Sequence, residues 1–194
     1  MTPARGPAET ARDRARLVAI IKARSFEAGP EIRLASGRTS TFYFNMKPTM
    51  LDPEGAHLIA HLIVDQLEGA EVDMVGGLEM GAVPIASAVA AVSYGRGRPL
   101  GAFFVRKEAK AHGTRSLIEG LARGETMNGR RLAVVEDVTT TGGSAIKAAH
   151  ALMAQGAVIE RVITVVDRED GAAEAFAAAG LKFVPILRLR DFQS

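Results

Sequence analysis

The chain of 194 residues contains no cysteine. Disulfides and thiolate metal sites are therefore excluded, which fits a reducing compartment such as the cytoplasm. No apolar run approaches the length of a membrane span. The first 16 residues mix charges and alanines without the apolar centre of a secretion signal. We therefore expect a cytoplasmic location.

A strong excess of charge is also missing, because the formal net charge at pH 7 is only +2. No concentrated basic helix or nucleic-acid recognition motif is present, so neither nucleic acid nor a membrane surface is expected as a partner. A hydrophobic content of 47% and a charged content of 24% are ordinary for a globular protein. The length suits one domain with a substantial core.

From residue 52 onward, apolar runs typical of strands alternate with helical patterns. This alternation predicts an α/β fold with a mainly parallel sheet flanked by helices. We expect a single domain, with a loose tail over residues 1–9, a small N-terminal cap over about 1–50 and an α/β core over about 51–194. Expected strands cover 31–34, 41–46, 72–75, 100–105, 132–135, 158–166 and 183–187, and expected helices cover 10–26, 53–67, 83–92, 143–155 and 171–179.

The stretch 132–144 carries the strongest chemical signal. An apolar run, Leu132–Val135, ends in Glu136 and Asp137, which a parallel strand would deliver to the usual ligand edge of the sheet. Two adjacent acids repel each other unless something occupies them. Carboxylates do not usefully bind phosphate, so we expect this pair to hold ribose hydroxyls or the water shell of a magnesium ion.

A turn rich in hydroxyls and glycines follows the acids. Gly142 and Gly143 allow main-chain N–H groups to approach an anion closely, and the expected helix behind them adds donors and a positive dipole end. Further hydroxyl donors are Thr139, Thr140, Thr141 and Ser144. The stretch therefore predicts a sugar-phosphate site. A buried strand with a ligand-free turn is the plain alternative, and a nucleotide P-loop fits less well because no Gly-Lys-Ser/Thr ending follows.

A second glycine-containing loop, Val75–Ala82, also follows an expected strand and precedes an expected helix. It would therefore lie at the same sheet edge and present main-chain donors to a second anion. Taken alone it is equally well explained as a plain turn between a strand and a helix. The loop includes Glu79 and Met80.

A basic segment, Arg106–Gly113, opens a mostly polar stretch of more than twenty residues. Stretches this long in a compact domain are usually functional lids or disordered. Mobile cations closing over a diphosphate leaving group would stabilise the transition state and exclude water. A solvated basic face is the alternative, and composition alone favours it. Its cations are Arg106, Lys107 and Lys110, accompanied by His112.

Two further features suit a planar, oxygen-rich base. Tyr43 and Phe44 lie in the segment Ser36–Asn45, and aromatic faces pack well on heterocycles, although half-exposed strand aromatics are more often core residues. Arg168 follows the expected strand 158–166, where its guanidinium would emerge at the ligand edge. A surface ion pair with a neighbouring acid is the alternative for Arg168.

These motifs, in this order over about residues 17–192, resemble those of the type I phosphoribosyltransferases. Residues 132–144 resemble the family's phosphoribosyl-pyrophosphate (PRPP) signature. The Arg-Lys-x-x-Lys-x-His-Gly wording of 106–113 is similar to the catalytic loop of the orotate phosphoribosyltransferases, and Ser36–Asn45 is similar to their orotate-binding segment. The resemblance implies transfer of ribose 5-phosphate from PRPP to orotate in de novo pyrimidine (UMP) biosynthesis.

The resemblance also implies residue roles. The candidate general acid/base is Asp137, the other catalytic candidates are Lys107, Lys110 and His112, and orotate would contact Tyr43, Phe44, Thr140 and Arg168. PRPP would contact Arg106, Lys107, Lys110, His112, Glu136, Asp137, Val138, Thr139, Thr140, Thr141, Gly142, Gly143, Ser144, Glu79 and Met80. The family places a non-proline cis peptide near Leu78–Glu79.

Cofactor and assembly also follow from the resemblance. Mg²⁺ is expected to bind through substrate oxygens and waters, with no direct protein ligand. A homodimer with shared active sites is expected, in which Arg106, Lys110 and His112 serve the neighbouring subunit and Lys107 serves its own.

Two departures distinguish this chain from the better-known bacterial branch of the family. That branch has lysines at the positions of Ala35 and Met80, and Lys47 is a candidate to compensate for one of them. Glu136 replaces an aspartate and keeps its charge. Two rival functions stay open from the sequence: a purine phosphoribosyltransferase, which should lack the 106–113 wording, and a non-catalytic regulator on the same fold.

Overall fold

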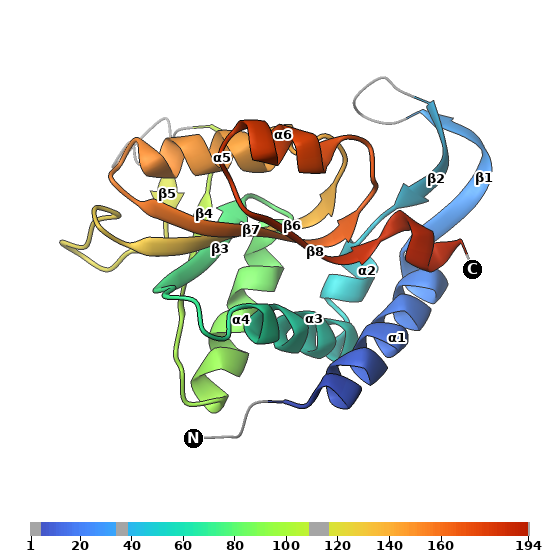
Figure 1. Ribbon diagram of the computed structural model, residues 1–194, viewed down its shortest axis with the longest axis horizontal. Helices are drawn as coiled ribbons and strands as arrows, with labels where there is room; N and C mark the ends of the chain where they lie inside the picture. The colour runs from blue at the N-terminus through green and yellow to red at the C-terminus, as the bar shows by residue number, and fades with distance from the viewer. Residues whose placement is uncertain (1–4, 34–38, 109–116, 194) are drawn as a thin grey trace.

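The computed structural model describes residues 5–33, 39–108 and 117–193, and within them a six-stranded sheet forms the centre of the molecule (Figure 1). The strand order is β5-β4-β3-β6-β7-β8. All neighbouring pairs are parallel except β4 with β5. The strands are β3 (Met74–Leu78), β4 (Gly101–Val105), β5 (Ile118–Glu119), β6 (Arg131–Thr139), β7 (Val158–Asp167) and β8 (Phe183–Arg188).

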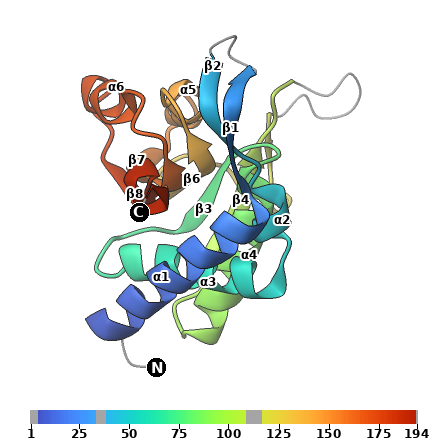
Figure 2. The ribbon, with the colours of Figure 1, turned by 90° about the vertical axis from the view of Figure 1, so that its right-hand side faces the viewer.

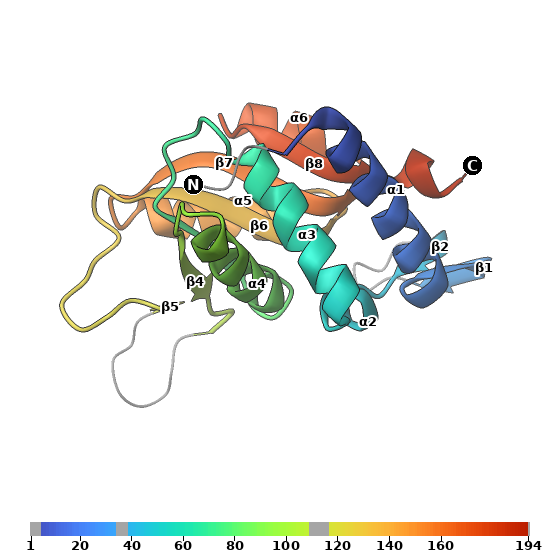
Figure 3. The ribbon, with the colours of Figure 1, turned by 90° about the horizontal axis from the view of Figure 1, so that it is seen from below.

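Helices cover both faces of this sheet, which confirms the predicted fold class. One face carries α5 (Gly143–Met153) and α6 (Ala172–Ala178), and the other carries α1 (Pro7–Arg24), α3 (Pro53–Gln66) and α4 (Ala82–Gly95) (Figures 1 and 3). In the part of the chain that the structure describes, no helix is long and apolar enough to cross a membrane.

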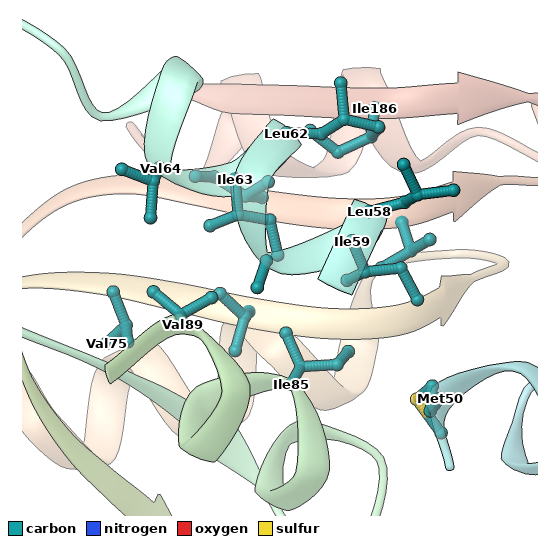
Figure 4. Close-up of a cluster of buried hydrophobic side chains, with 14 of the residues drawn as sticks. Met50, Leu58, Ile59, Leu62, Ile63, Val64, Val75, Ile85, Val89 and Ile186 are labelled. Carbon is teal, nitrogen blue, oxygen red and sulfur yellow. The ribbon is translucent and has the colours of Figure 1, made fainter. Parts of the chain in front are cut away.

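Two hydrophobic clusters hold these layers together. The larger lies between α1, α3, α4 and the sheet, and part of it is drawn in Figure 4. The smaller lies under α5 and α6 on the opposite face. Burial of apolar side chains on both faces explains why the inner strands are nearly continuous apolar runs. The residues labelled in Figure 4 are Met50, Leu58, Ile59, Leu62, Ile63, Val64, Val75, Ile85, Val89 and Ile186.

A separate antiparallel ribbon of β1 (Phe26–Arg33) and β2 (Thr39–Phe44) projects beside the large sheet (Figure 2). Its base is fixed by aromatic packing, since the Phe44 ring centroid lies 5.0 Å from those of both Phe26 and Phe192. This ribbon makes up part of the predicted cap, residues 1–50. Helix α1 instead packs into the helical layer through Leu17 and Ile21, both fully buried.

Most predicted elements lie within a few residues of their observed bounds, and the differences have physical reasons. Helix α1 begins at Pro7, a residue whose fixed φ suits the first helical turn. Three short elements were not predicted: β5, the single turn α2 (Lys47–Met50) and the 3-10 helix η1 (Leu189–Phe192). Strand β6 continues through Thr139, so the acid pair lies inside the strand rather than after it. Its pairing with β7 extends as far as Thr139 opposite Asp167.

Candidate active site

The acid pair of β6 lies between two cavities. The smaller, of about 200 Å³, is lined by Glu136 and by the turn that leads into α5. The larger, of about 620 Å³, is lined by both Glu136 and Asp137. Ser144 also borders both cavities. The two cavities share these lining residues and lie at the carboxyl end of the sheet, where a parallel α/β fold is expected to bind its ligand.

The smaller cavity is built largely from main chain. Gly142 has a φ of 80°, in the left-handed region, and immediately precedes α5. A Cβ there would also lie 3.0 Å from the ring of Phe176. The first turn of α5 presents N–H groups without partners within the helix, which is a favourable environment for an anion. The lining residues are Glu136, Val138, Thr139, Thr140, Thr141, Gly142, Gly143, Ser144 and Ala145.

Two buried polar atoms of this cavity point to a polar ligand. Among the described residues, neither Glu136 Oε2 nor Thr139 Oγ1 has a hydrogen-bond partner. Thr139 is only 2% exposed, so bulk water does not readily satisfy its hydroxyl. Because buried polar groups are normally paired, these atoms mark where a ligand or bound water would complete the site.

The loop Leu78–Gly81 forms an adjoining wall of the larger cavity. It contains a cis peptide bond between Glu79 and Met80, one residue later than predicted. The Glu79 side chain accepts a hydrogen bond of 3.0 Å from the main-chain N–H of Lys107. The loop also packs directly against the acid pair, because a Cβ on Gly81 would lie 2.6 Å from Asp137 Oδ1.

The two glycine loops and the acid pair therefore converge on one site, as the sequence predicted. The turn after β6 lies at one end, the loop Leu78–Gly81 lies at the other, and Glu136 and Asp137 lie between them. The larger cavity also has an apolar rim, which no sequence motif predicted. That rim consists of Met50, Leu51, Val83 and Pro84.

The electrostatics of the acid pair are unusual. Burial and, to a smaller extent, the charge of Asp137 raise the pKa of Glu136, the charge of Lys107 lowers it, and the net result is a pKa of about 8. Burial also raises the pKa of Asp137, whereas main-chain N–H groups of Val138 and Asp137 and the charges of Lys47 and Lys107 lower it. A carboxyl group whose pKa is raised in this way is able to exchange a proton near neutral pH.

The two cations of the basic segment that the structure describes, Arg106 and Lys107, have different surroundings. Lys107 lines the larger cavity. The guanidinium of Arg106 instead lies against β5, with Nη1 3.9 Å from Glu119 Oε1. The predicted residues Lys110 and His112 lie outside the described residues.

The aromatic residues of β2 face opposite ways, as alternation along a strand requires. Tyr43 is 39% exposed, whereas Phe44 is 6% exposed and enclosed in the aromatic cluster with Phe26 and Phe192. The Phe44 ring is therefore a core contact, unlike the base-stacking surface that the sequence led us to expect.

Arg168 is not a surface residue. It is 5% exposed, its guanidinium carbon lies 4.8 Å from the centroid of the Phe42 ring, and its Nε lies 3.4 Å from Asp170. Its main-chain N–H donates to the carbonyl of Thr139. The ion pair considered from sequence is thus present within the segment after β7. The contact between Arg168 and the Phe42 ring joins that segment to the ribbon β1–β2.

Comparisons with known proteins agree with this geometry. The phosphoribosyl transferase domain family matches residues 49–179. A protein of Bradyrhizobium sp. (strain ORS 278) named orotate phosphoribosyltransferase is 59% identical over 179 residues, covering 92% of this chain and 96% of its own. One of the same name from Rhodopseudomonas palustris (strain TIE-1) is 60% identical and covers 92% and 95%.

Solved structures extend the comparison. Mycobacterium tuberculosis orotate phosphoribosyltransferase in complex with Fe(III) dicitrate is 40% identical, with a TM-score of 0.80 and coverage of 94% of this chain and 99% of that one. The same enzyme in complex with PRPP is 37% identical, with a TM-score of 0.76 and the same coverage. This chain therefore belongs to the phosphoribosyltransferase family and, within it, to the orotate phosphoribosyltransferases.

Proposed function

We propose that the cavities around Glu136 and Asp137 are where this chain performs the orotate phosphoribosyltransferase reaction. The chain is a pentosyltransferase that moves the ribose 5-phosphate group of PRPP to orotate. The products are orotidine 5′-monophosphate and diphosphate, and the step belongs to de novo pyrimidine (UMP) biosynthesis. The observation that carries the site assignment is the convergence of both glycine loops and the acid pair.

The two cavities suit the two ends of PRPP. The 5′-phosphate is assigned to the smaller one, where main-chain N–H groups, hydroxyls and a helix N-terminus favour an anion. The ribose hydroxyls are assigned to Glu136 and Asp137, and the diphosphate to the larger cavity beside Glu79, Met80 and Lys107. The turn residues assigned to the 5′-phosphate are Val138, Thr139, Thr140, Thr141, Gly142, Gly143 and Ser144.

In the transfer step the bond between ribose C1 and the diphosphate oxygen breaks, and a bond from C1 to the attacking ring nitrogen of orotate forms. The diphosphate leaves with the bonding electrons, and the ring nitrogen gives up its proton. Asp137 is the proposed general acid/base. Lys107, together with Lys110 and His112, would stabilise charge on the departing diphosphate and exclude water that would otherwise hydrolyse the ribosyl centre.

The base is assigned to side chains of β2, of the turn after β6 and of the segment after β7. Tyr43 presents the more exposed ring, Thr140 adds a hydroxyl, and the buried guanidinium of Arg168 suits the oxygen-rich rim of orotate. Phe44 supports this arrangement from inside the aromatic cluster rather than by stacking on the base.

Mg²⁺ fits the chemistry of this site. The unsatisfied Glu136 Oε2 and the neighbouring Asp137 carboxyl provide oxygen atoms of the kind that a hydrated magnesium shell prefers. We propose that the ion is held mainly through substrate oxygens and waters. When bound, it neutralises charge on the diphosphate.

A homodimer with shared sites is also part of the proposal. Lys107 lines the cavity of its own subunit while Arg106 turns toward Glu119, which agrees with different subunits using the two residues. Mixing inactive Lys110→Ala chains with inactive Asp137→Ala chains should restore partial activity. No recovery despite confirmed subunit exchange would count against shared sites. A single domain over residues 1–194 and a cytoplasmic location remain predictions.

One assay separates the candidate functions. Mixing the chain with PRPP, Mg²⁺ and orotate should cause a loss of orotate absorbance. Turnover of adenine, hypoxanthine or xanthine but not orotate would favour a purine enzyme. Binding of PRPP without turnover of any base would favour a regulator. The identity of the relatives argues for orotate, since those at about 60% identity carry that name.

A further inference from the structure

The larger cavity has an unusual charge balance for a diphosphate site. Of its described lining residues, three are acids (Glu79, Glu136 and Asp137) and two are cations (Lys47 and Lys107). A diphosphate group carries several negative charges, so it needs cations placed against these acids. The loop Leu78–Gly81 adds none of its own, because Met80 is neutral and 64% exposed.

Lys47 reaches this cavity from a rigid support. It begins the single turn α2, which lies between the ribbon β1–β2 and α3 (Figures 1 and 2). Met46, which precedes this turn, and Thr49 within it are 1% and 0% exposed, and Thr49 Oγ1 lies 2.6 Å from Ser25 Oγ. The main chain of Lys47 is therefore fixed to the core while its exposed side chain lines the cavity.

Lys107 comes from a different direction. It follows β4, and its main-chain N–H is bonded to Glu79 of the loop Leu78–Gly81. Two lysines carried by unrelated elements thus line the same cavity. Their charges also act on the same carboxyl, since both lower the otherwise raised pKa of Asp137.

We propose that Lys47 is a substrate-binding residue that holds the diphosphate group of PRPP from the α2 side of the cavity, supplying the cation that the loop Leu78–Gly81 lacks. The inference rests on the proposed site. The ammonium group of Lys47 also favours the ionised form of Asp137. Lys47 therefore links diphosphate binding to the charge of the acid pair.

The test uses the full chain with three substitutions. Lys47→Met keeps the length and apolar stem but removes the charge, Lys47→Arg restores a cation, and Lys182→Met removes an exposed lysine that does not line the described cavity. Steady-state kinetics give KM for PRPP and for orotate, and calorimetry gives the affinity for inorganic diphosphate with Mg²⁺. Thermal melting checks that each variant is folded.

Lys47→Met should raise KM for PRPP and weaken diphosphate binding by roughly tenfold, the effect of losing one charge-assisted contact. KM for orotate should change less than about twofold on the same reasoning. Lys47→Arg should recover most of the loss, and Lys182→Met should behave as the original chain. If Lys47→Met melts early, Lys47→Gln replaces it.

Unchanged diphosphate affinity and PRPP KM in folded Lys47→Met or Lys47→Gln would overturn the inference while orotate turnover persisted. A change confined to the KM for orotate would overturn it as well. Diphosphate binding by the original chain without orotate turnover would instead count against the proposed function.

Discussion

The two walls of the proposed active site are built in different ways. The phosphate wall, residues 136–145, is one continuous segment of β6, turn and α5 that offers mainly main-chain groups. The cation wall brings together Lys47, the loop Leu78–Gly81 and Lys107 from three separate parts of the chain. The first wall is defined by local sequence, whereas the second exists only once the sheet and α2 have assembled.

This difference predicts where substitutions act. Changes in the phosphate wall and its acids should affect the chemical step or the local backbone. Changes in the cation wall should affect mainly substrate affinity, and the Lys47 variants measure this effect. The two walls touch where Gly81 packs on Asp137. A substitution at this contact should therefore affect both the chemical step and substrate affinity.

The largest effect should come from Asp137→Asn, which keeps the shape of the side chain and removes its ability to exchange a proton. We expect kcat to fall by about 10³-fold, within the range for loss of a general acid/base. The assay is orotate absorbance at saturating substrates. A loss of less than about tenfold in a folded variant would remove Asp137 from that role.

A strong effect is also expected from Gly81→Ala. The new Cβ would lie 2.6 Å from Asp137 Oδ1, so the loop, the acid or both must move. A displacement on this scale should lower kcat/KM by about 10²-fold. Gly95→Ala is the matched control, because a Cβ there meets nothing within 4 Å. Equal kcat/KM of the Gly81→Ala and Gly95→Ala variants would mean that activity does not depend on the contact between Gly81 and Asp137.

The pH dependence of stability tests the burial of the acid pair. Glu136 has a pKa of about 8 in the folded chain against an ordinary value of 4.5. The folded state therefore binds more protons, and the free energy of unfolding without ligand should decrease as pH rises between these values. Glu136→Gln should remove roughly 2 kcal/mol of that decrease between pH 5 and 7.

Urea unfolding of both proteins at several pH values measures this effect. Asp137, whose pKa burial also raises, should leave part of the slope in the variant. If the free energy of unfolding changes with pH equally in Glu136→Gln and in the original chain, Glu136 is solvated and has an ordinary pKa in the folded protein.

The smallest effects should separate the two aromatic neighbours of β2. Phe44→Leu should lower the free energy of unfolding by about 1 kcal/mol through lost packing, with little change in KM for orotate. Tyr43→Leu should raise KM for orotate a few-fold with little loss of stability. The opposite pattern, measured by urea unfolding and steady-state kinetics, would return the base-stacking role to Phe44.

The fold of the phosphate wall could be predicted from the sequence because its pattern is local. An apolar run followed by acids, hydroxyls and glycines has few structural interpretations, and the alternating elements from residue 52 onward allow little freedom in topology. The extension of β6 through Thr139 was missed because Glu136 and Asp137 are poor strand formers by propensity. Their pairing with β7 overrides that preference.

The cation wall and the ribbon were harder to predict. Nothing in the local pattern shows that α2 would carry Lys47 to the same cavity as Lys107, because that depends on packing around Thr49 and Ser25. The inward orientation of Phe44 was hard to predict for a similar reason. Alternation along β2 was visible, but which of Tyr43 and Phe44 faces inward depends on Phe26 and Phe192.

A crystal structure of the chain with PRPP and Mg²⁺ tests the central claim most directly. The 5′-phosphate should lie in the turn 139–144, the ribose hydroxyls should contact Glu136 and Asp137, and the diphosphate should lie between the loop Leu78–Gly81 and Lys47. Binding of PRPP away from the acid pair, or with its two ends on separate surfaces, would contradict the account.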